Sequence, residues 1–334
     1  MKDTRPTLGF IGAGITGTAL AVQLSLNGYR IVATNSRNRS SSESLASRVS
    51  GCRVCDTAQE VADLAQAVFI TTPDDIIADI AASLTWHEGR TVIHCSGVHS
   101  IDILEPACKF GAHICCLHPL QAFAGLEQAI CNIEGSTFGL EGDAEVLTML
   151  KDMASALNGN TIILKAGDKA LYHAAAVTVS NYLVTLMKTA ADLWASFGVS
   201  QEEAVRSLLP LLKGTVRNIE NVGIPGCLAG PIARGDILTV RRHLDALHRE
   251  HPATLEMYRM LGLKTLSVAL AKGRISLETA GEIQALLEGR QSPAPELPAE
   301  FYEELIGIMA EADISNHASL EKPLQPPDRV SKGD

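Results

Sequence analysis

Apolar and polar positions along the first half of the chain follow two alternating patterns. Short continuous apolar runs, typical of buried strands, alternate with segments whose apolar residues recur at helical spacing. The predicted strands are 8–11, 29–34, 67–71, 91–95, 136–140 and 161–164. The predicted helices include 19–24, 58–65, 75–84 and 143–157. This alternation predicts an α/β fold with a doubly wound parallel sheet of the Rossmann type.

From residue 167 the strand pattern stops and an all-α domain is predicted. Its expected helices are 168–197, 201–221, 236–250, 252–271 and 276–289. The first is much longer than a typical helix and apolar on most of its faces, so we expect it in the middle of a helical domain or at a subunit interface. The predicted domains are 1–166, which binds a dinucleotide, and 167–290, which holds the substrate and the contact of a homodimer. A Pro-rich link, a short amphipathic helix and a disordered tail are expected in 291–334.

A glycine turn joins the first strand to the first helix. Gly12, Gly14 and Gly17 have the spacing that lets a chain turn tightly, approach a pyrophosphate and pack a helix against a strand. Ile15 and Thr16 begin the helix, whose free N–H groups would face phosphate oxygens. We therefore predict a dinucleotide site; the alternative is a purely structural turn.

The residues after the second strand favour NADP. An NAD site usually has an Asp or Glu there for the ribose 2′-hydroxyl, whereas this chain has no acid before Glu43 and offers Ser36, Arg37 and Arg39. Ser36 and Arg37 are the predicted contacts to the 2′-phosphate of NADPH. The alternative is a solvated polar loop.

Charge and cysteine content limit the class of protein. A formal net charge of −10 argues against nucleic-acid binding and anionic membranes, since both need a basic surface. Without an evident signal peptide or spanning segment, we expect a cytoplasmic protein with reduced thiols. Cys52 and Cys55 have no second pair to complete a zinc site. On a strand, His113 and Cys115 would face away from Cys116 and His118, so no metal site is predicted.

Chemistry is expected at the carboxyl ends of the strands, where open parallel sheets bind ligands. Thr72 and Pro73 follow one predicted strand, Ser96 and Gly97 follow the next, and His118 follows a third. For Thr72 and Ser96, cofactor contact and simple turn chemistry are both open.

Two polar groups lie in the helical half. On the long helix, His173 and Ser180 are two turns apart on one stripe, with Asn181 beside them and Lys169 one turn before His173. Such groups on an apolar helix need partners, which a substrate or a neighbouring helix could supply.

The second group is Arg234 with Asp236, which follow Gly230 and Pro231 at a helix start. Arg234 could grip a carboxylate in a bidentate manner; alternatively, the segment is a helix entry capped by Asp236.

Together these stretches resemble Rossmann-like proteins with a C-terminal helical domain of unknown function, in the superfamily of 6-phosphogluconate dehydrogenase. Its members include ketopantoate reductase, pyrroline-5-carboxylate reductase and prephenate dehydrogenase. The similarity covers 6–271, most specifically at 94–97, 117–120, 172–181 and 230–236. It implies a nicotinamide facing the first long helix. Aligning the family's asparagine with Asn181 puts His173 where ketopantoate reductase has a lysine.

These expectations predict an NADP-dependent oxidoreductase that transfers a hydride to a C=O or C=N carbon of a small carboxylate, ketopantoate being the first candidate by analogy. The predicted roles are general acid for His173, alternative donor for Lys169, orientation by Ser180 and Asn181, carboxylate binding by Arg234 with Asp236, and proton relay by His118. The alternatives are a non-catalytic NADP sensor or scaffold, and a dehydrogenase for an imino acid or a prephenate-type compound.

Overall fold

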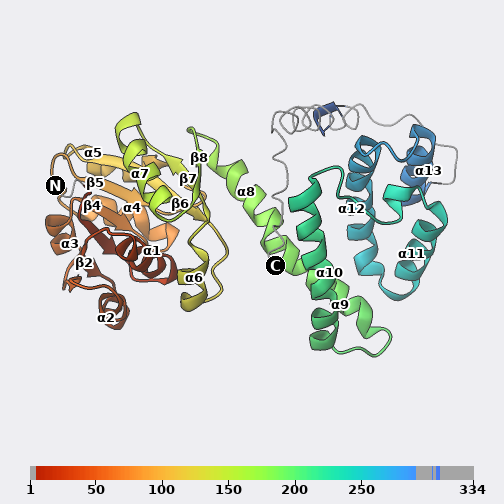
Figure 1. Ribbon diagram of the computed structural model, residues 1–334, viewed down its shortest axis with the longest axis horizontal. Helices are drawn as coiled ribbons and strands as arrows, with labels where there is room; N and C mark the ends of the chain where they lie inside the picture. Colours follow the sequence, from red (N-terminus) through yellow and green to blue (C-terminus); the bar gives the residue numbers. More distant parts are fainter. Residues whose placement is uncertain (1–4, 291–302, 304–305, 309–334) are drawn as a thin grey trace, which may run out of the picture. The chain divides into compact units, whose positions relative to one another are not determined.

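The computed structural model describes residues 5–290, 303 and 306–308, and divides into two compact units (Figure 1). The first unit ends at Leu183 and the second begins at Val184. This structural division does not test the predicted boundary at residue 166 between a dinucleotide-binding domain and a substrate domain, which stays a prediction. Of the predicted short C-terminal helix, 303 and 306–308 are helical, and the remainder of 291–334 lies outside the described residues.

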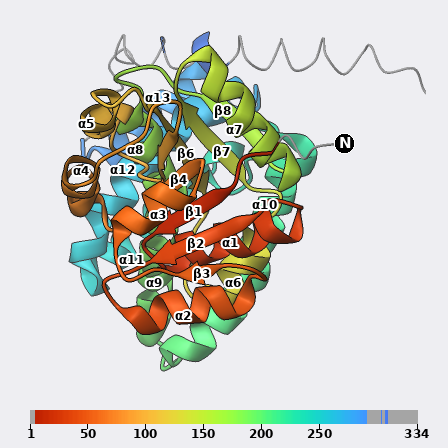
Figure 2. The ribbon, with the colours of Figure 1, turned by 90° about the vertical axis from the view of Figure 1, so that its left-hand side faces the viewer.

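The first unit is built on an eight-stranded sheet in the order β3-β2-β1-β4-β5-β6-β7-β8. The strands are β1 (Leu8–Ile11), β2 (Ile31–Asn35), β3 (Arg53–Val54), β4 (Ala67–Ile70), β5 (Thr91–His94), β6 (His113–Leu120), β7 (Thr137–Glu141) and β8 (Asn160–Ile163). Figure 2 shows β1 beside β2 and β4. The strand order reverses around β1, so the carboxyl ends of β1 and β4 flank the position where such sheets bind ligands.

Helices cover both faces of this sheet. They are α1 (Ile15–Leu26), α2 (Arg39–Arg48), α3 (Ala58–Leu64), α4 (Asp74–Ser83), α5 (Glu105–Cys108), α6 (Leu126–Asn132) and α7 (Ala144–Ala156), with a 3-10 turn at Ile101–Leu104. One buried cluster joins α1, α6 and α7 to the strands through Leu20, Ile133 and Leu150. A second joins α3 and α4 through Val61 and Ile77. The α/β prediction is confirmed, since apolar runs with helices on both sides require a two-faced core.

The sheet departs from the predicted parallel arrangement at one pair. β6 is parallel to β5, but β7 runs antiparallel to β6. β6 also extends through His118 to Leu120, so His118 lies within a strand rather than after one. Apolar runs of this kind carry no information about strand direction.

The second unit is helical, as predicted. Besides most of α9 (Asn181–Ala195), it contains α10 (Gln201–Val222), α11 (Ile237–Glu250), α12 (Pro252–Ala271) and α13 (Leu277–Leu287), with a 3-10 turn at Ile232–Arg234. A buried cluster that includes Val240, Leu266 and Ile283 forms its core.

The predicted long helix is two helices, α8 (Lys169–Val179) and α9 (Asn181–Ala195). The break is at Ser180, whose φ of −106° and ψ of −70° leave the regular helix. Lys169 and Ala191 are the buried residues of these two helices, so the burial expected in the middle of a domain is not observed in the chain by itself. The alternative, a subunit interface, stays a prediction. Among the described residues, the stretch Lys169–Ala195 meets the length and composition of a membrane span, a criterion that core helices of soluble proteins also meet.

Candidate functional site

The glycine turn after β1 has the geometry that the motif requires. Gly12 has a φ of +102°, and a Cβ there would lie 2.7 Å from the carbonyl carbon of Thr71. A Cβ at Gly17 would meet the Thr71 hydroxyl and lie 2.5 Å from the Gly12 oxygen. A Cβ at Gly14 would meet nothing within 4 Å. A side chain at Gly12 or Gly17 would therefore clash with the protein, whereas the turn is open at Gly14. Among the described residues, no side chain caps the N–H groups of α1 there.

Two further groups line the carboxyl ends near this turn. Ile15 is exposed and Thr16 is half-buried at the start of α1. After β4, the hydroxyl of Thr72 is buried and has no hydrogen-bond partner among the described residues, and Pro73 precedes α4. A buried hydroxyl without a partner costs free energy unless a ligand or water satisfies it.

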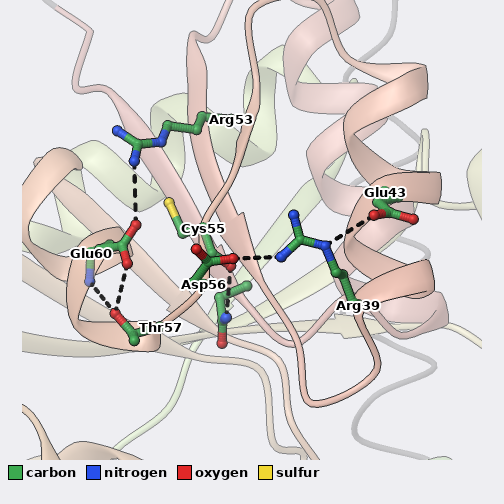
Figure 3. A network of polar contacts seen from close by, with 8 residues as sticks. Arg39, Glu43, Arg53, Cys55, Asp56, Thr57 and Glu60 are labelled. Carbon is green, nitrogen blue, oxygen red and sulfur yellow. Dashed lines mark hydrogen bonds and ion pairs between the residues drawn. The ribbon is translucent and has the colours of Figure 1, made fainter.

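The two arginines that follow β2 differ in their partners, and Figure 3 shows Arg39 beside Asp56 and Glu43. Arg39 donates to Asp56 over 2.5 Å and to Glu43 over 3.1 Å. Arg37 is exposed and Ser36 is half-buried. Because its charge is already paired, Arg39 is less suited to a phosphate than Arg37.

Ser96 and Gly97 form a tight loop after β5. The Ser96 hydroxyl donates to Asp74 over 2.8 Å and accepts from the N–H groups of Val98 and His99 at 3.3 and 3.1 Å. Its side chain thus serves the turn. A Cβ at Gly97 would lie 2.6 Å from Cδ2 of His173 and 2.8 Å from Nε2 of His118, so only glycine fits beneath these two imidazoles without displacing them.

His118 is held by a tyrosine that the sequence analysis did not assign to the site. The Tyr172 hydroxyl lies 2.9 Å from Nδ1 of His118, and the two rings meet edge to face. The same hydroxyl lies against Gly139, where a Cβ would be 2.7 Å from its oxygen, so glycine leaves room for the phenol. Burial raises the pKa of Tyr172 to about 12. The phenol therefore stays protonated near pH 7. When it donates to Nδ1, the proton of His118 lies on Nε2, facing Gly97.

Lys169 is buried beneath this loop. Its Nζ donates to the Ser96 carbonyl over 2.7 Å and to Sγ of Cys116 over 2.9 Å. Burial, with the Lys169 charge acting in the same direction, lowers the pKa of His118 to about 4 and that of His94 to about 3. His94 accepts from the Ser96 N–H at Nδ1, and its buried Nε2 has no partner among the described residues.

The remaining predicted site residues belong to later segments of the chain. Ser180 is at the break between α8 and α9, and Asn181 is exposed. Arg234 and Asp236 belong to the second unit. Asp236 accepts from Thr239 through both carboxylate oxygens, which makes it the N-cap of α11, while Arg234 is exposed. Among the described residues, no group of His, Cys, Asp and Glu could hold a metal ion.

Two family models match this chain. Residues 1–119 match a Rossmann-like domain, and residues 136–265 match DUF2520, a domain of unknown function. The chain thus combines a Rossmann-like domain with a DUF2520 domain. The predicted resemblance is confirmed, and the DUF2520 match begins within the sheet and includes Gly139 and α8 of this Rossmann-like protein. No curated protein matches the chain at a significant level.

Solved structures share the fold of this Rossmann-like DUF2520 protein. A protein from Thermotoga maritima is 25% identical with a TM-score of 0.65, covering 80% of this chain and all of that one (100%). A structure from Bacteroides fragilis, described as a candidate NADP oxidoreductase, is 24% identical with a TM-score of 0.62 and covers 78% and 98% of the two chains. An imine reductase from Pseudomonas sp. is 19% identical with a TM-score of 0.55 and covers 85% and 99%.

Spacing along α8 explains which site residues a sequence could reveal. Lys169, Tyr172 and His173 are three and four residues apart, which places them on one helix face. That signal was available for Tyr172. Cys116 and Gly139, by contrast, lie on neighbouring strands whose pairing no local pattern specifies.

Proposed function

We propose that this protein is an NADP-dependent oxidoreductase that reduces a C=O or C=N carbon of a small carboxylate. The observation that carries the proposal is the pair of His118 and His173 over Gly97. These two imidazoles and the glycine turn, which is open to a ligand at Gly14, both lie at the carboxyl ends of the parallel strands. A site that combines a phosphate-binding turn with a cluster of proton-donating side chains suits a hydride-transfer enzyme better than a non-catalytic scaffold.

The residues present fit a dinucleotide phosphate. Gly14 leaves room for the pyrophosphate at the N-terminus of α1, and the unpartnered Thr72 hydroxyl offers it a further contact. Ser36 and Arg37 would hold the 2′-phosphate, since Arg39 is engaged with Asp56. When bound, NADPH supplies the hydride.

The protein's own groups would handle the proton. His118 stays neutral near pH 7 because burial lowers its pKa to about 4, so its Nε2–H can orient or polarise the substrate's oxygen or nitrogen but is a poor source of a full proton. His173 is the proposed general acid. Lys169 is fixed by the Ser96 carbonyl and Cys116, so we assign it to holding the loop rather than to donating the proton.

The substrate class rests on similarity and on the acid-base groups. A 2-oxo acid such as ketopantoate and a cyclic imino acid both present a polar double bond beside a carboxylate. The proposed carboxylate ligand is Arg234, with Asp236 fixing the start of α11, and Ser180 and Asn181 are the proposed orienting groups. We also propose a cytoplasmic homodimer, because large apolar residues are exposed along α8, α9 and α10: Leu171, Val179, Val184 and Leu211.

The test follows NADPH absorbance with purified protein and a panel of 2-oxo acids and cyclic imines, with NADPH affinity measured separately by calorimetry. We expect oxidation with at least one carbonyl or imine, and a His173→Ala variant that binds NADPH normally but turns over at least about a hundredfold more slowly. NADPH binding with no turnover on any member would overturn the enzyme proposal and favour a sensor. Equal turnover of the variant would remove His173 from the mechanism.

A further inference from the structure

A buried amine and a buried thiol lie in contact beneath the Ser96–Gly97 loop. Nζ of Lys169 is 2.9 Å from Sγ of Cys116, and their exposed fractions are 3% and 0%. Lys169 is the first residue of α8, and Cys116 lies in the middle of β6. Neither side chain has a step in the proposed reaction, so the contact calls for a separate explanation.

Cys116 differs from the thiols around it. Sγ of Cys116 and Sγ of Cys115 both face a backbone carbonyl, at 3.6 Å from Ser96 and 3.8 Å from Val92, but Sγ of Cys116 also accepts from a lysine nitrogen. Burial raises the pKa of Cys116 to about 11, and the Lys169 charge opposes that rise. Burial raises the pKa of Cys95 and Cys115 well above the usual value of a thiol. Because the thiolate is the form that reacts with oxidants, Cys116 is the favoured site among these three.

The position of the nitrogen is fixed as well. Nζ also donates to the Ser96 carbonyl over 2.7 Å, which keeps it beside the sulfur instead of leaving it to rotate through other rotamers. A sulfenic acid formed on Cys116 would therefore have a nitrogen nucleophile in contact with its sulfur. Sulfenic acids condense with neighbouring thiols or nitrogens when these are close enough.

We propose that Cys116 and Lys169 form an oxidative modification site, in which hydrogen peroxide converts the contact into a covalent sulfenamide. In the first step Sγ attacks peroxide: the O–O bond breaks, an S–O bond forms, and water leaves with the thiol proton. Sulfur is thereby oxidised by two electrons and peroxide is reduced. In the second step the ammonium first loses one proton to solvent. The lone pair of Nζ then attacks Sγ, the S–N bond forms as the S–O bond breaks, and the hydroxyl leaves as water with a second proton from the nitrogen. The protein loses two hydrogen atoms in total.

This link would join the start of α8 to β6. The two residues are 53 positions apart, so the bond closes a long loop and should raise the midpoint of thermal unfolding by limiting the unfolded chain. It would also fix the helix that carries Tyr172 and His173 to the sheet. The site would then respond to peroxide independently of any substrate.

The test treats the full-length protein with excess hydrogen peroxide and measures its mass and its tryptic map. We expect a loss of about 2 Da that dithiothreitol reverses, because thiols reopen such bonds. In the map, trypsin should no longer cleave after Lys169, and peptide 166–188 should be joined to peptide 110–151, which contains Cys116. Fragmentation of this pair should place the bond between Cys116 and Lys169.

Matched variants separate this link from other oxidations. Cys115→Ser removes the adjacent thiol and should keep the linked peptide, whereas Cys116→Ser and Lys169→Met should both lose it. The map of the native sequence stands even where a variant folds poorly. Addition of oxygen atoms at Cys116 with normal cleavage after Lys169, a disulfide from Cys116 to another thiol, or an unchanged mass would each overturn the proposal.

Discussion

Replacing Gly17 or Gly14 in the turn after β1 by alanine should affect two different properties, the stability of the fold for Gly17 and the binding of NADPH for Gly14. At Gly17 the new Cβ would meet the Thr71 hydroxyl and lie 2.5 Å from the Gly12 oxygen. The Thr71 hydroxyl already donates to that oxygen over 2.6 Å, so neither group can move without breaking a hydrogen bond. At Gly14 the new Cβ would enter open space, and the backbone there, with φ at −78°, suits any residue.

The expected magnitudes follow from these contacts. Overpacking typically costs about 1–3 kcal/mol, and the better helix propensity of alanine returns roughly 1 kcal/mol, so Gly17→Ala should lower the free energy of unfolding by up to about 2 kcal/mol. Gly14→Ala loses a preferred N-cap but also restricts the unfolded chain, and these terms nearly cancel, leaving a change within about 0.5 kcal/mol. Its methyl group should nevertheless obstruct the pyrophosphate and weaken NADPH binding at least tenfold, or about 1.4 kcal/mol.

Urea unfolding at equilibrium and calorimetric titration with NADPH measure the two effects separately. The reasoning fails if Gly14→Ala is destabilised as much as Gly17→Ala, since that would mean the turn is closed at Gly14. It also fails if Gly14→Ala binds NADPH as tightly as the native protein, because the open space would then not be the phosphate site.

Three other predictions test the charges in the first unit. Arg37→Ala should raise the NADPH dissociation constant at least tenfold, whereas Arg39→Ala, whose guanidinium is paired with acids, should change it less than threefold; a larger effect at Arg39 in titrations would contradict this. Because burial lowers the pKa of His94 to about 3, the unfolded chain binds more protons below pH 6.5, and stability should fall as pH drops from 6.5 towards 3, by up to about 1.4 kcal/mol per pH unit. A His94→Asn variant with the same slope in urea titrations would refute this. Lys169→Met removes the charge that lowers the pKa of His118, so NMR titration should show that pKa rising, and an unchanged value would exclude the effect.

The sequence predicted those parts of the fold that depend on short-range patterns. The buried strands at β1, β4 and β5 and the helices of the second unit follow from hydrophobic periodicity. The antiparallel direction of β7 could not be predicted from this periodicity, because the direction of a strand is set by its packing across the sheet. The break at Ser180 was also missed, since an apolar helix pattern passes through it without glycine or proline.

The site divides in the same way. Glycine spacing predicted the open position at Gly14, and helical spacing brought Lys169 and His173 to one face. The partners of the Lys169 amine could not be predicted: Lys169 was expected as an alternative proton donor, yet its nitrogen donates to Cys116 and the Ser96 carbonyl. Contacts between β6 and the first turn of α8 join residues far apart in the chain, and only the folded structure brings them together.

One helix face explains why these groups occur together. Lys169, Tyr172 and His173 occupy the first turns of α8, where i, i+3 and i+4 positions face the sheet together. Lys169 holds the Ser96 carbonyl, Tyr172 holds His118, and His173 lies against Gly97, so all three contact either the loop after β5 or strand β6. A rotation of α8 would therefore disturb all three at once. The chemistry of this site therefore depends on the position of α8 against the sheet, and the Lys169–Cys116 contact holds the first residue of that helix.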